Sequence, residues 1–485
     1  MTFVSDLEPS ALWAHFDRLL EIPRGSRREE RAREHVLSIA RRNGLEHEVD
    51  ATGNVVVRKP ARPGREDAPA VVLQAHLDMV QEKNSDTEFD FDADAIRPVR
   101  DGEWLRADGT TLGSDNGIGV AAMLALLEAE DVAHGPLELL FTIDEETGLT
   151  GAAGLDGELL RGRTLINLDS EEEAVLTIGC AGGADTHLHL PVAREAVPDG
   201  AEGLEVRVAG LKGGHSGVDV HLQRGNAIAI VARALRHAFE AVPTLRVASL
   251  AGGNAHNAIP REAHAVAVVD AADAGEAAAL LEAELAAAGA ELATSDPGLT
   301  WTVERGGAPA DAWTSGTTAD ATALLAALPF GVLRMSDDIE GLVETSTNLA
   351  VASEGDGRLT VLMSSRSSVM SALAAVRRRL RALGALVGAE VAEKDGYPGW
   401  KPDPSSPLLG VMRTVHREVT GVEPEVGAVH AGLECGIIGE KVPGMDMISF
   451  GPQIEFPHSP DERVRIDSVA PFWRVVTATL ERLAD

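Results

Sequence analysis

The sequence is poor in cysteine, in long apolar runs and in basic residues. Its two cysteines, Cys180 and Cys435, are too few and too distant for a disulfide framework, which fits a reducing compartment. The longest strongly apolar run, 117–127, falls well short of the roughly 20 residues that a membrane span requires. The opening stretch MTFVSDLEPS lacks the basic and apolar segments of a secretory signal. We therefore expect a cytoplasmic protein with no membrane partner.

Acidic residues outnumber basic ones by 76 to 43, which leaves a formal net charge of −33. A field of that sign repels nucleic-acid phosphates, so nucleic acid is not an expected partner. The acidic residues are interspersed along the chain, so we attribute them to solubility rather than to electrostatic steering of a substrate. At 485 residues the chain is longer than one hydrophobic core usually serves, so at least two domains are expected.

In residues 1–200 helical patterns alternate with short strands, which predicts an α/β domain with a mainly parallel sheet covered by helices. From residue 201 the order becomes strand, helix, strand, strand, helix, strand, which is the split βαβ (ferredoxin-like) arrangement, followed by a partial second copy. We predict that 201–394 form an inserted α+β lid and that 395–485 complete the catalytic domain.

The ends of the predicted strands carry the candidate site, because α/β sheets bind ligands beyond the carboxyl ends of their strands. His76 and Asp78 follow the strand at 71–73 and point to the same side. One of them can therefore bind a metal while the other orients the metal-binding side chain. Taken alone, such a pair is more often structural. Asp169 ends the strand 164–168, although the acidic residues after it are also typical of a solvated loop.

Asp144, Glu145 and Glu146 follow the buried strand 137–143, and three successive carboxylates repel each other unless cations or protons relieve them. Adjacent side chains diverge, so Glu146 can bind an ion while Glu145 stands over the water attached to it.

Two further candidates have ordinary alternatives when each is taken singly. Asp115 precedes an apolar helix, where it can be an N-cap, but a helix N-terminus also suits a carboxylate that bridges two metals. His458 lies in the prolyl loop 456–460, where a surface histidine is the alternative. Together, two histidines and three carboxylates without a thiol suit a pair of zinc ions, with Mn²⁺ or Co²⁺ as substitutes.

In this order, these residues resemble the family of dinuclear zinc exopeptidases and deacylases that includes carboxypeptidase G, aminoacylases and dipeptidases, and most of all its aminoacyl-histidine dipeptidase branch. The resemblance covers essentially the whole chain. It implies a bridging Asp115, one ion completed by His76 and Asp169, and the other completed by Glu146 and His458. It further implies Glu145 as general base, Asp78 as the orienter of His76, and a cis peptide between Asp115 and Asn116.

The resemblance extends to the lid. His215 resembles a histidine that reaches the active site of a neighbouring protomer and stabilises the oxyanion, which implies a homodimer formed through the lid. Asn257 and Arg366 resemble groups that hold the terminal carboxylate of the substrate, a task that suits the planar fork of arginine. Without the resemblance, Arg366 is equally well explained as a surface residue. The segment 431–433 (Ala-Gly-Leu) departs from the Gly-Gly-Thr loop of other branches.

The expected function is metal-dependent hydrolysis of dipeptides, Xaa-His and carnosine-like ones among them, by a hydroxide that bridges two zinc ions. An N-acyl amino acid amidohydrolase with the same metal centre is the alternative enzyme. A catalytically silent protein that binds metal or peptide is a further alternative, against which Glu145 argues, because a binding site needs no base beside the water.

Overall fold

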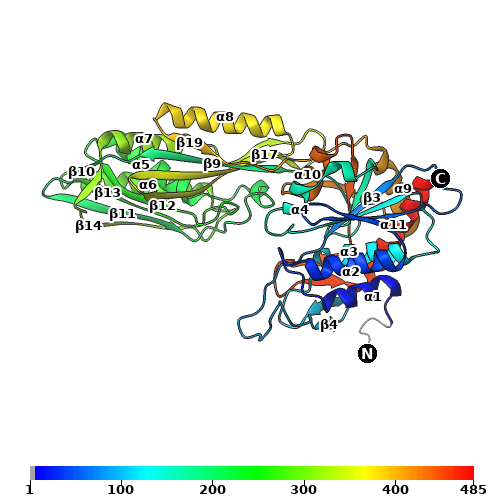
Figure 1. Cartoon of the computed structure of the whole chain (residues 1–485). Coiled ribbons are helices and arrows are strands. Elements are labelled where there is room, and N and C mark those ends of the chain that lie inside the picture. Colours follow the sequence, from blue (N-terminus) through cyan, green and yellow to red (C-terminus); the bar gives the residue numbers. More distant parts are fainter. Residues whose placement is uncertain (1–5) are drawn as a thin grey trace. The chain divides into compact units, whose positions relative to one another are not determined.

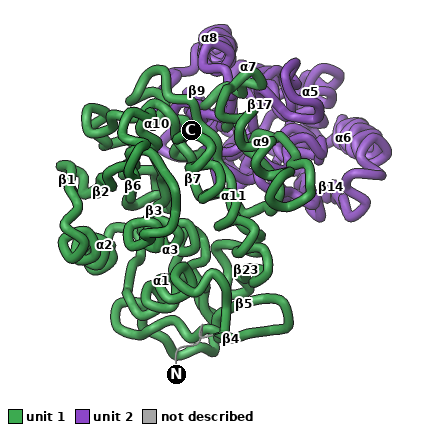
Figure 2. The backbone as a smooth tube through the Cα atoms, turned by 90° about the vertical axis from the view of Figure 1, so that its right-hand side faces the viewer, with its two compact units in different colours: residues 1–180, 400–428, 433–485 green, residues 181–399, 429–432 purple. Residues whose placement is uncertain are grey.

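The computed structural model describes residues 6–485 and divides the chain into two compact units. Unit 1 comprises residues up to 180 together with 400–428 and 433–485, and unit 2 comprises 181–399 and 429–432 (Figure 2). The blue, cyan and red segments of Figure 1 thus belong to unit 1, and the green and yellow middle of the chain forms unit 2.

Unit 2 begins at residue 181 and not at the expected 201. The reason is strand β9 (Gly182–Pro191), which pairs with β18 (Arg358–Ser367) and β19 (Glu390–Glu393) in the sheet of unit 2. At its other end the unit reaches 399 and not 394. The return of 429–432 to unit 2 has no counterpart in the predicted boundaries.

An eight-stranded sheet forms the centre of unit 1, in the order β1-β2-β6-β3-β7-β21-β8-β20. Strand β3 runs parallel to β6 and β7, and β7 runs parallel to β21, whereas β2 and β8 join antiparallel at the flanks. The predicted fold class is confirmed. These strands are β1 (Glu46–Val49), β2 (Val55–Lys59), β3 (Val71–His76), β6 (Leu137–Thr142), β7 (Thr164–Asn167), β8 (Val175–Cys180), β20 (Glu425–Val429) and β21 (Asp446–Ser449).

Both faces of this sheet are covered, because every residue of β2, β3 and β6 is buried although successive side chains point to opposite sides. The helix that precedes β6 is buried almost all round, as its apolar sequence requires. The helices of unit 1 are α1 (Ser10–Leu20), α2 (Glu30–Arg42), α3 (Ser114–Glu128), α4 (Thr150–Gly154), α9 (Pro407–Thr420), α10 (Glu434–Lys441), α11 (Ile466–Ala484) and the 3₁₀ turn η1 (Gly157–Leu159). Among the helices of residues 6–485, none combines the length and apolarity that crossing a bilayer takes.

A small sheet in unit 1 was not predicted, because its strands have only two to four residues, too few to show a period. Its order is β22-β23-β5-β4, built from β4 (Pro98–Asp101), β5 (Trp104–Ala107), β22 (Ile454–Glu455) and β23 (Arg463–Arg465). His458 lies in the connection between β22 and β23, and β5 leads into the loop that carries Asp115. This sheet therefore brings two distant parts of the chain together.

Unit 2 contains a nine-stranded antiparallel sheet with the path β14-β11-β13-β12-β17-β18-β9-β19, and β16 pairs with β17 beside it. Its first half has the predicted order of strands and helices. The elements are β10 (Arg194–Ala196), β11 (Ala201–Ala209), β12 (Arg246–Gly252), β13 (Ala263–Asp270), β14 (Thr300–Gly307), β15 (Asp311–Trp313), β16 (Gly331–Met335), β17 (Val343–Gly355), α5 (Ala227–Ala241), α6 (Ala274–Glu291), α7 (Ser315–Ala327), α8 (Met370–Leu386) and η2 (Val220–Leu222).

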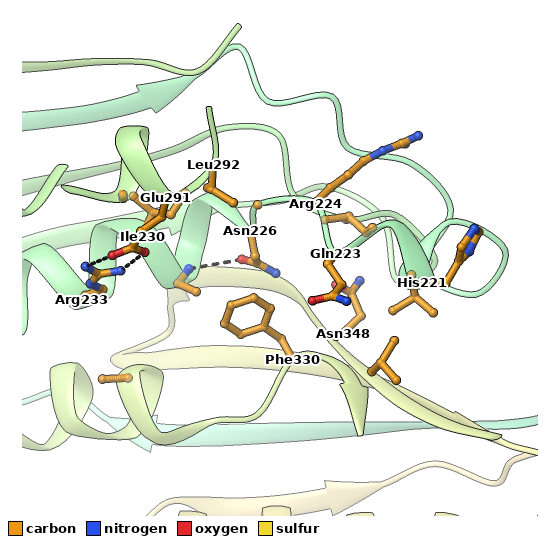
Figure 3. A pocket seen from close by; sticks show the side chains of 18 of the residues that line it. His221, Gln223, Arg224, Asn226, Ile230, Arg233, Glu291, Leu292, Phe330 and Asn348 are labelled. Carbon is orange, nitrogen blue, oxygen red and sulfur yellow. Dashed lines mark hydrogen bonds and ion pairs between the residues drawn. The ribbon is translucent and has the colours of Figure 1, made fainter. Parts of the chain in front are cut away.

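A cavity of about 810 Å³ opens beside α5 in unit 2 (Figure 3). Apolar side chains such as Ile230 and Phe330 line it, and the ion pair of Arg233 with Glu291 lies at one end. No candidate metal ligand lines this cavity, so the predicted chemistry has to be sought in unit 1.

Candidate metal centre

Asp115 lies between two groups of metal-binding side chains in unit 1. Its Oδ1 is 3.1 Å from Nε2 of His76, and its Oδ2 is 3.1 Å from Nε2 of His458. Asp169 completes the first group at 3.2 Å from His76, and Glu146 completes the second at 3.0 Å from His458. The structure therefore brings all five predicted ligands together, with one carboxylate oxygen of Asp115 facing each histidine.

The donor set fits a pair of cations. The atoms of His76, Asp115 and Asp169 lie within 4.8 Å of one another, and so do those of Asp115, Glu146 and His458. Oε1 of Glu146 is buried without a hydrogen-bond partner, as expected of an oxygen reserved for a ligand. Hydrogen bonds to Asp115 and Glu146 raise the pKa of His458 to about 11, so the surroundings strongly favour positive charge.

Asp78 contacts three residues of this site, namely His76, Glu145 and Glu146. It is fully buried, and its Oδ1 is 3.3 Å from Nδ1 of His76, so it can fix the ring as predicted. The same carboxylate accepts the backbone N–H groups of Glu145 and Glu146 at 3.1 and 3.2 Å. Although burial opposes it, the adjacent His76 ring and the hydrogen bonds from Glu145 N–H and the Ser26 hydroxyl lower the pKa of Asp78 to about 2, so the group stays ionised.

Only two of the three successive carboxylates after β6 belong to the centre. Asp144 adopts a left-handed backbone (φ 48°) and pairs with Arg27 at 3.2 Å, so its charge is relieved by arginine and not by a metal. Glu145 lies within 4.8 Å of the donor atoms of His76 and Glu146. Burial and the neighbouring charges, Asp169 first among them, raise the pKa of Glu145 well above its usual value, which makes it a stronger base.

The loop before α3 is held by a buried carboxylate that sequence reasoning missed. Glu462, 2% exposed, accepts the backbone N–H groups of Leu112 and Gly113 at 2.7 and 2.9 Å, and those of Ser114 and Asp115 at 2.7 and 3.3 Å. The hydroxyl of Ser114 also donates to it at 2.6 Å. Because Glu462 stands four residues after His458, it joins the loops of two ligands.

The backbone around the centre is unusual at two ligands. The peptide between Asp115 and Asn116 is cis, which confirms that prediction. His458 has φ 61°, a left-handed conformation that a non-glycine residue adopts only where its surroundings enforce it. At the start of α3, Asp115 (φ −81°, ψ 111°) and Asn116 (φ −103°, ψ 32°) have non-helical backbone conformations. Both carboxylate oxygens of Asp115 face histidines, as the bridging interpretation expects.

Glu171 is a second residue that sequence reasoning did not place at the site. The acidic residues that follow Asp169 in the sequence are typical of a loop exposed to solvent. In the structure, burial and the charges of Asp115 and Asp169 raise the pKa of Glu171, so it lies near the centre. Only tertiary structure distinguishes it from its exposed neighbour Glu172.

The three predicted lid residues all lie in unit 2. Nδ1 of His215 accepts the N–H groups of Gly217 and Val218 at 3.3 and 3.1 Å, so the ring proton sits on Nε2 and is available for donation. A Cβ on Gly217 would lie 3.1 Å from His215 and 3.2 Å from Arg366, so these two side chains are neighbours. The backbone carbonyl of Asn257 accepts the N–H of Ser216 at 2.7 Å, and its side chain is exposed.

Two histidines and a ring of carboxylates around a shared aspartate, at the carboxyl edge of a parallel sheet, define a metal-dependent hydrolase. Residues 72–482 match the model of "Peptidase family M20/M25/M40". The chain belongs to this family, and the prediction of a metallopeptidase is confirmed.

Two relatives resemble the chain over essentially its full length. The chain is 43% identical to the cytosol non-specific dipeptidase of Escherichia coli, covering 100% of this chain and 99% of that one. It matches the structure of aminoacylhistidine dipeptidase from Vibrio alginolyticus with a TM-score of 0.93 at 42% identity, covering 99% and 98% of the two chains. Aminopeptidase PepT from Bacillus cereus, at 16% identity over 99% and 100% of the chains and a TM-score of 0.58, shares the fold alone.

Replacing Glu462 by glutamine should weaken metal binding. The carboxylate of Glu462 accepts four backbone N–H groups, and the NH₂ of a glutamine could not accept any of them. We expect metal affinity to fall about 10- to 100-fold, as measured by titration of the metal-free protein. Glu172→Gln, the same change at an exposed position, is the control and should bind metal normally. Equal affinity in both variants would show that Glu462 does not position the ligands.

Proposed function

We propose that the protein is a dipeptidase that uses two zinc ions, or Mn²⁺ or Co²⁺ in their place, to hydrolyse unblocked dipeptides, Xaa-His and carnosine-like ones included. The observation that carries the proposal is Asp115, whose two oxygens each face a different histidine with its own carboxylate partner. The names of the two relatives above 40% identity, both dipeptidases, support the substrate class.

The chain's own residues supply the proton transfer. Two cations bound in this centre would polarise the scissile carbonyl and lower the pKa of a shared water. Glu145 takes the proton of the attacking water and passes it to the departing amine, a role favoured by its raised pKa and by its place between the two groups of donors. Asp78 holds the backbone of Glu145, so base and ligand keep a fixed geometry.

The lid residues recognise the substrate and its transition state. Arg366 takes the terminal carboxylate together with Asn257, and His215 stabilises the oxyanion through Nε2–H. Burial and the charge of Arg366 lower the pKa of His215, which keeps the ring neutral and its Nδ1 available to the backbone. His215 and Arg366 are neighbours in unit 2, which supports a joint role in binding the substrate.

The assembly and location belong to the proposal as well. The sequence resemblance of His215 to a cross-protomer histidine supports a homodimer formed through the lid. The name of the Escherichia coli relative supports a cytosolic place, where the enzyme would break down small peptides.

Glu145→Gln should keep both metal ions and lose turnover by roughly 10²- to 10⁴-fold, because the amide cannot accept the proton. Steady-state kcat and metal content of the purified variant are the measurements. Glu172→Gln, the same change at an exposed position nearby, should behave as wild type. A kcat near wild type at full metal occupancy would remove Glu145 as the base.

A substrate panel separates the proposed dipeptidase from its alternatives. Carnosine, alanyl-histidine, other dipeptides and N-acetyl amino acids are assayed with added zinc or manganese. We expect unblocked dipeptides to have the highest kcat/KM. Faster cleavage of N-acetyl amino acids would establish the amidohydrolase, and tight peptide binding without any hydrolysis would establish the silent binding protein.

Mixing two inactive variants tests the cross-protomer role of His215. After Glu145→Gln and His215→Ala proteins are dissociated and reassembled together, hybrid dimers would contain one intact site, and about a quarter of wild-type activity should return. Each variant treated alone is the control. No recovery, with mixed dimers demonstrated by differential tags, would mean that His215 serves its own chain.

A further inference from the structure

Arg366 is a buried cation without an acidic partner. It is 7% exposed, and among residues 6–485 no carboxylate lies within ion-pair distance of its guanidinium. Its Nε is buried without a hydrogen-bond partner. An unpaired buried charge is costly, so the geometry leaves this guanidinium ready for an anionic group of a ligand.

One side-chain contact orients this guanidinium. Within the described residues, the only side-chain hydrogen bond of Arg366 runs from Nη1 to the hydroxyl of Tyr397, at 2.9 Å. The contact spans three neighbouring backbone segments. Arg366 on β18 pairs with Gly183 on β9, and Gly183 pairs in turn with Tyr397 through N–H to carbonyl bonds of 3.0 and 3.1 Å.

Tyr397 can reach Arg366 only because the residue between them has no side chain. A Cβ on Gly183 would lie 2.6 Å from the Tyr397 hydroxyl and 2.7 Å from its Cζ, so the ring covers this glycine. A Cβ on Gly432 would lie 2.8 Å from Cε2 of the same ring. Two glycines therefore make the slot in which the tyrosine stands, and Gly432 belongs to the segment that departs from the Gly-Gly-Thr loop.

We propose that Tyr397 is a positioning residue that holds Arg366 in the orientation that receives the free carboxylate of the substrate. This inference rests on the proposed function of Arg366. A long arginine side chain loses much rotamer freedom when it is fixed, and a contact made before binding removes that cost from the binding step. Tyr397 therefore acts on KM for substrates that carry the carboxylate, and not on the chemistry at the metal centre.

The test compares free dipeptides with the same dipeptides amidated at the C-terminus. Tyr397→Phe removes only the hydroxyl. KM for the free dipeptide should rise about tenfold, as expected for one hydrogen bond to a charged group, while kcat changes less than about threefold. Kinetic constants for the amidated dipeptide should stay unchanged, because it has no carboxylate for Arg366 to receive. A general structural defect would instead alter both substrates.

Gly432→Ala supplies an independent variant, since the added methyl displaces the ring of Tyr397. It should raise KM for the free dipeptide, and in a Tyr397→Phe background it should add less than about twofold to the preference for acid over amide. Gly316→Ala is the matched control. Gly316 lies in α7 of unit 2 with open space around its Cα, and the change should leave both substrates unaffected.

Arg366→Ala distinguishes failure of this inference from failure of the proposed function. If it abolishes the preference for the free acid while Tyr397→Phe retains the full preference, Tyr397 does not position Arg366, although Arg366 keeps its role. If Arg366→Ala leaves the preference intact, the carboxylate role of Arg366 is wrong and the inference falls with it. Loss of preference in Arg366→Ala, Tyr397→Phe and Gly432→Ala together supports the proposal.

Discussion

The metal centre depends on how one buried carboxylate gathers backbone N–H groups. Glu462 binds the turn that precedes α3, and this turn presents Asp115 with its two oxygens facing different histidines. Charge-assisted bonds of this kind are roughly twice as strong as neutral ones, so a single side chain can determine the path of four residues. Because Glu462 follows His458 in the same loop, one interaction sets the distance between the shared ligand and one of its partners.

The remaining ligands come from the sheet itself. Strands β3, β6 and β7 are parallel neighbours, so His76, Glu146 and Asp169 emerge at the same edge without further adjustment. The small sheet of β4, β5, β22 and β23 then brings the C-terminal loop to that edge. A regular scaffold supplies one half of the centre, and short irregular segments supply the other.

This division explains what the sequence could reveal. His76, Glu145, Glu146 and Asp169 were predictable because each ends a strand with a clear apolar pattern. The lid's strand order was predictable for the same reason. Glu462 and Glu171 were missed, since a buried carboxylate and a solvated one look alike in an acidic loop. Tyr397 was missed because its partner is reached across Gly183, and pairing between distant segments leaves no local signal.

The short excursion of residues 429–432 into unit 2 bears on how this architecture can be altered. The polypeptide passes between the units at four points and not two, so a single deletion does not remove the whole of unit 2. Deleting 181–399 alone would remove Tyr397, whose aromatic ring packs against Gly432. Exchanging unit 2 for that of a relative would therefore have to include residues 429–432 as well as 181–399.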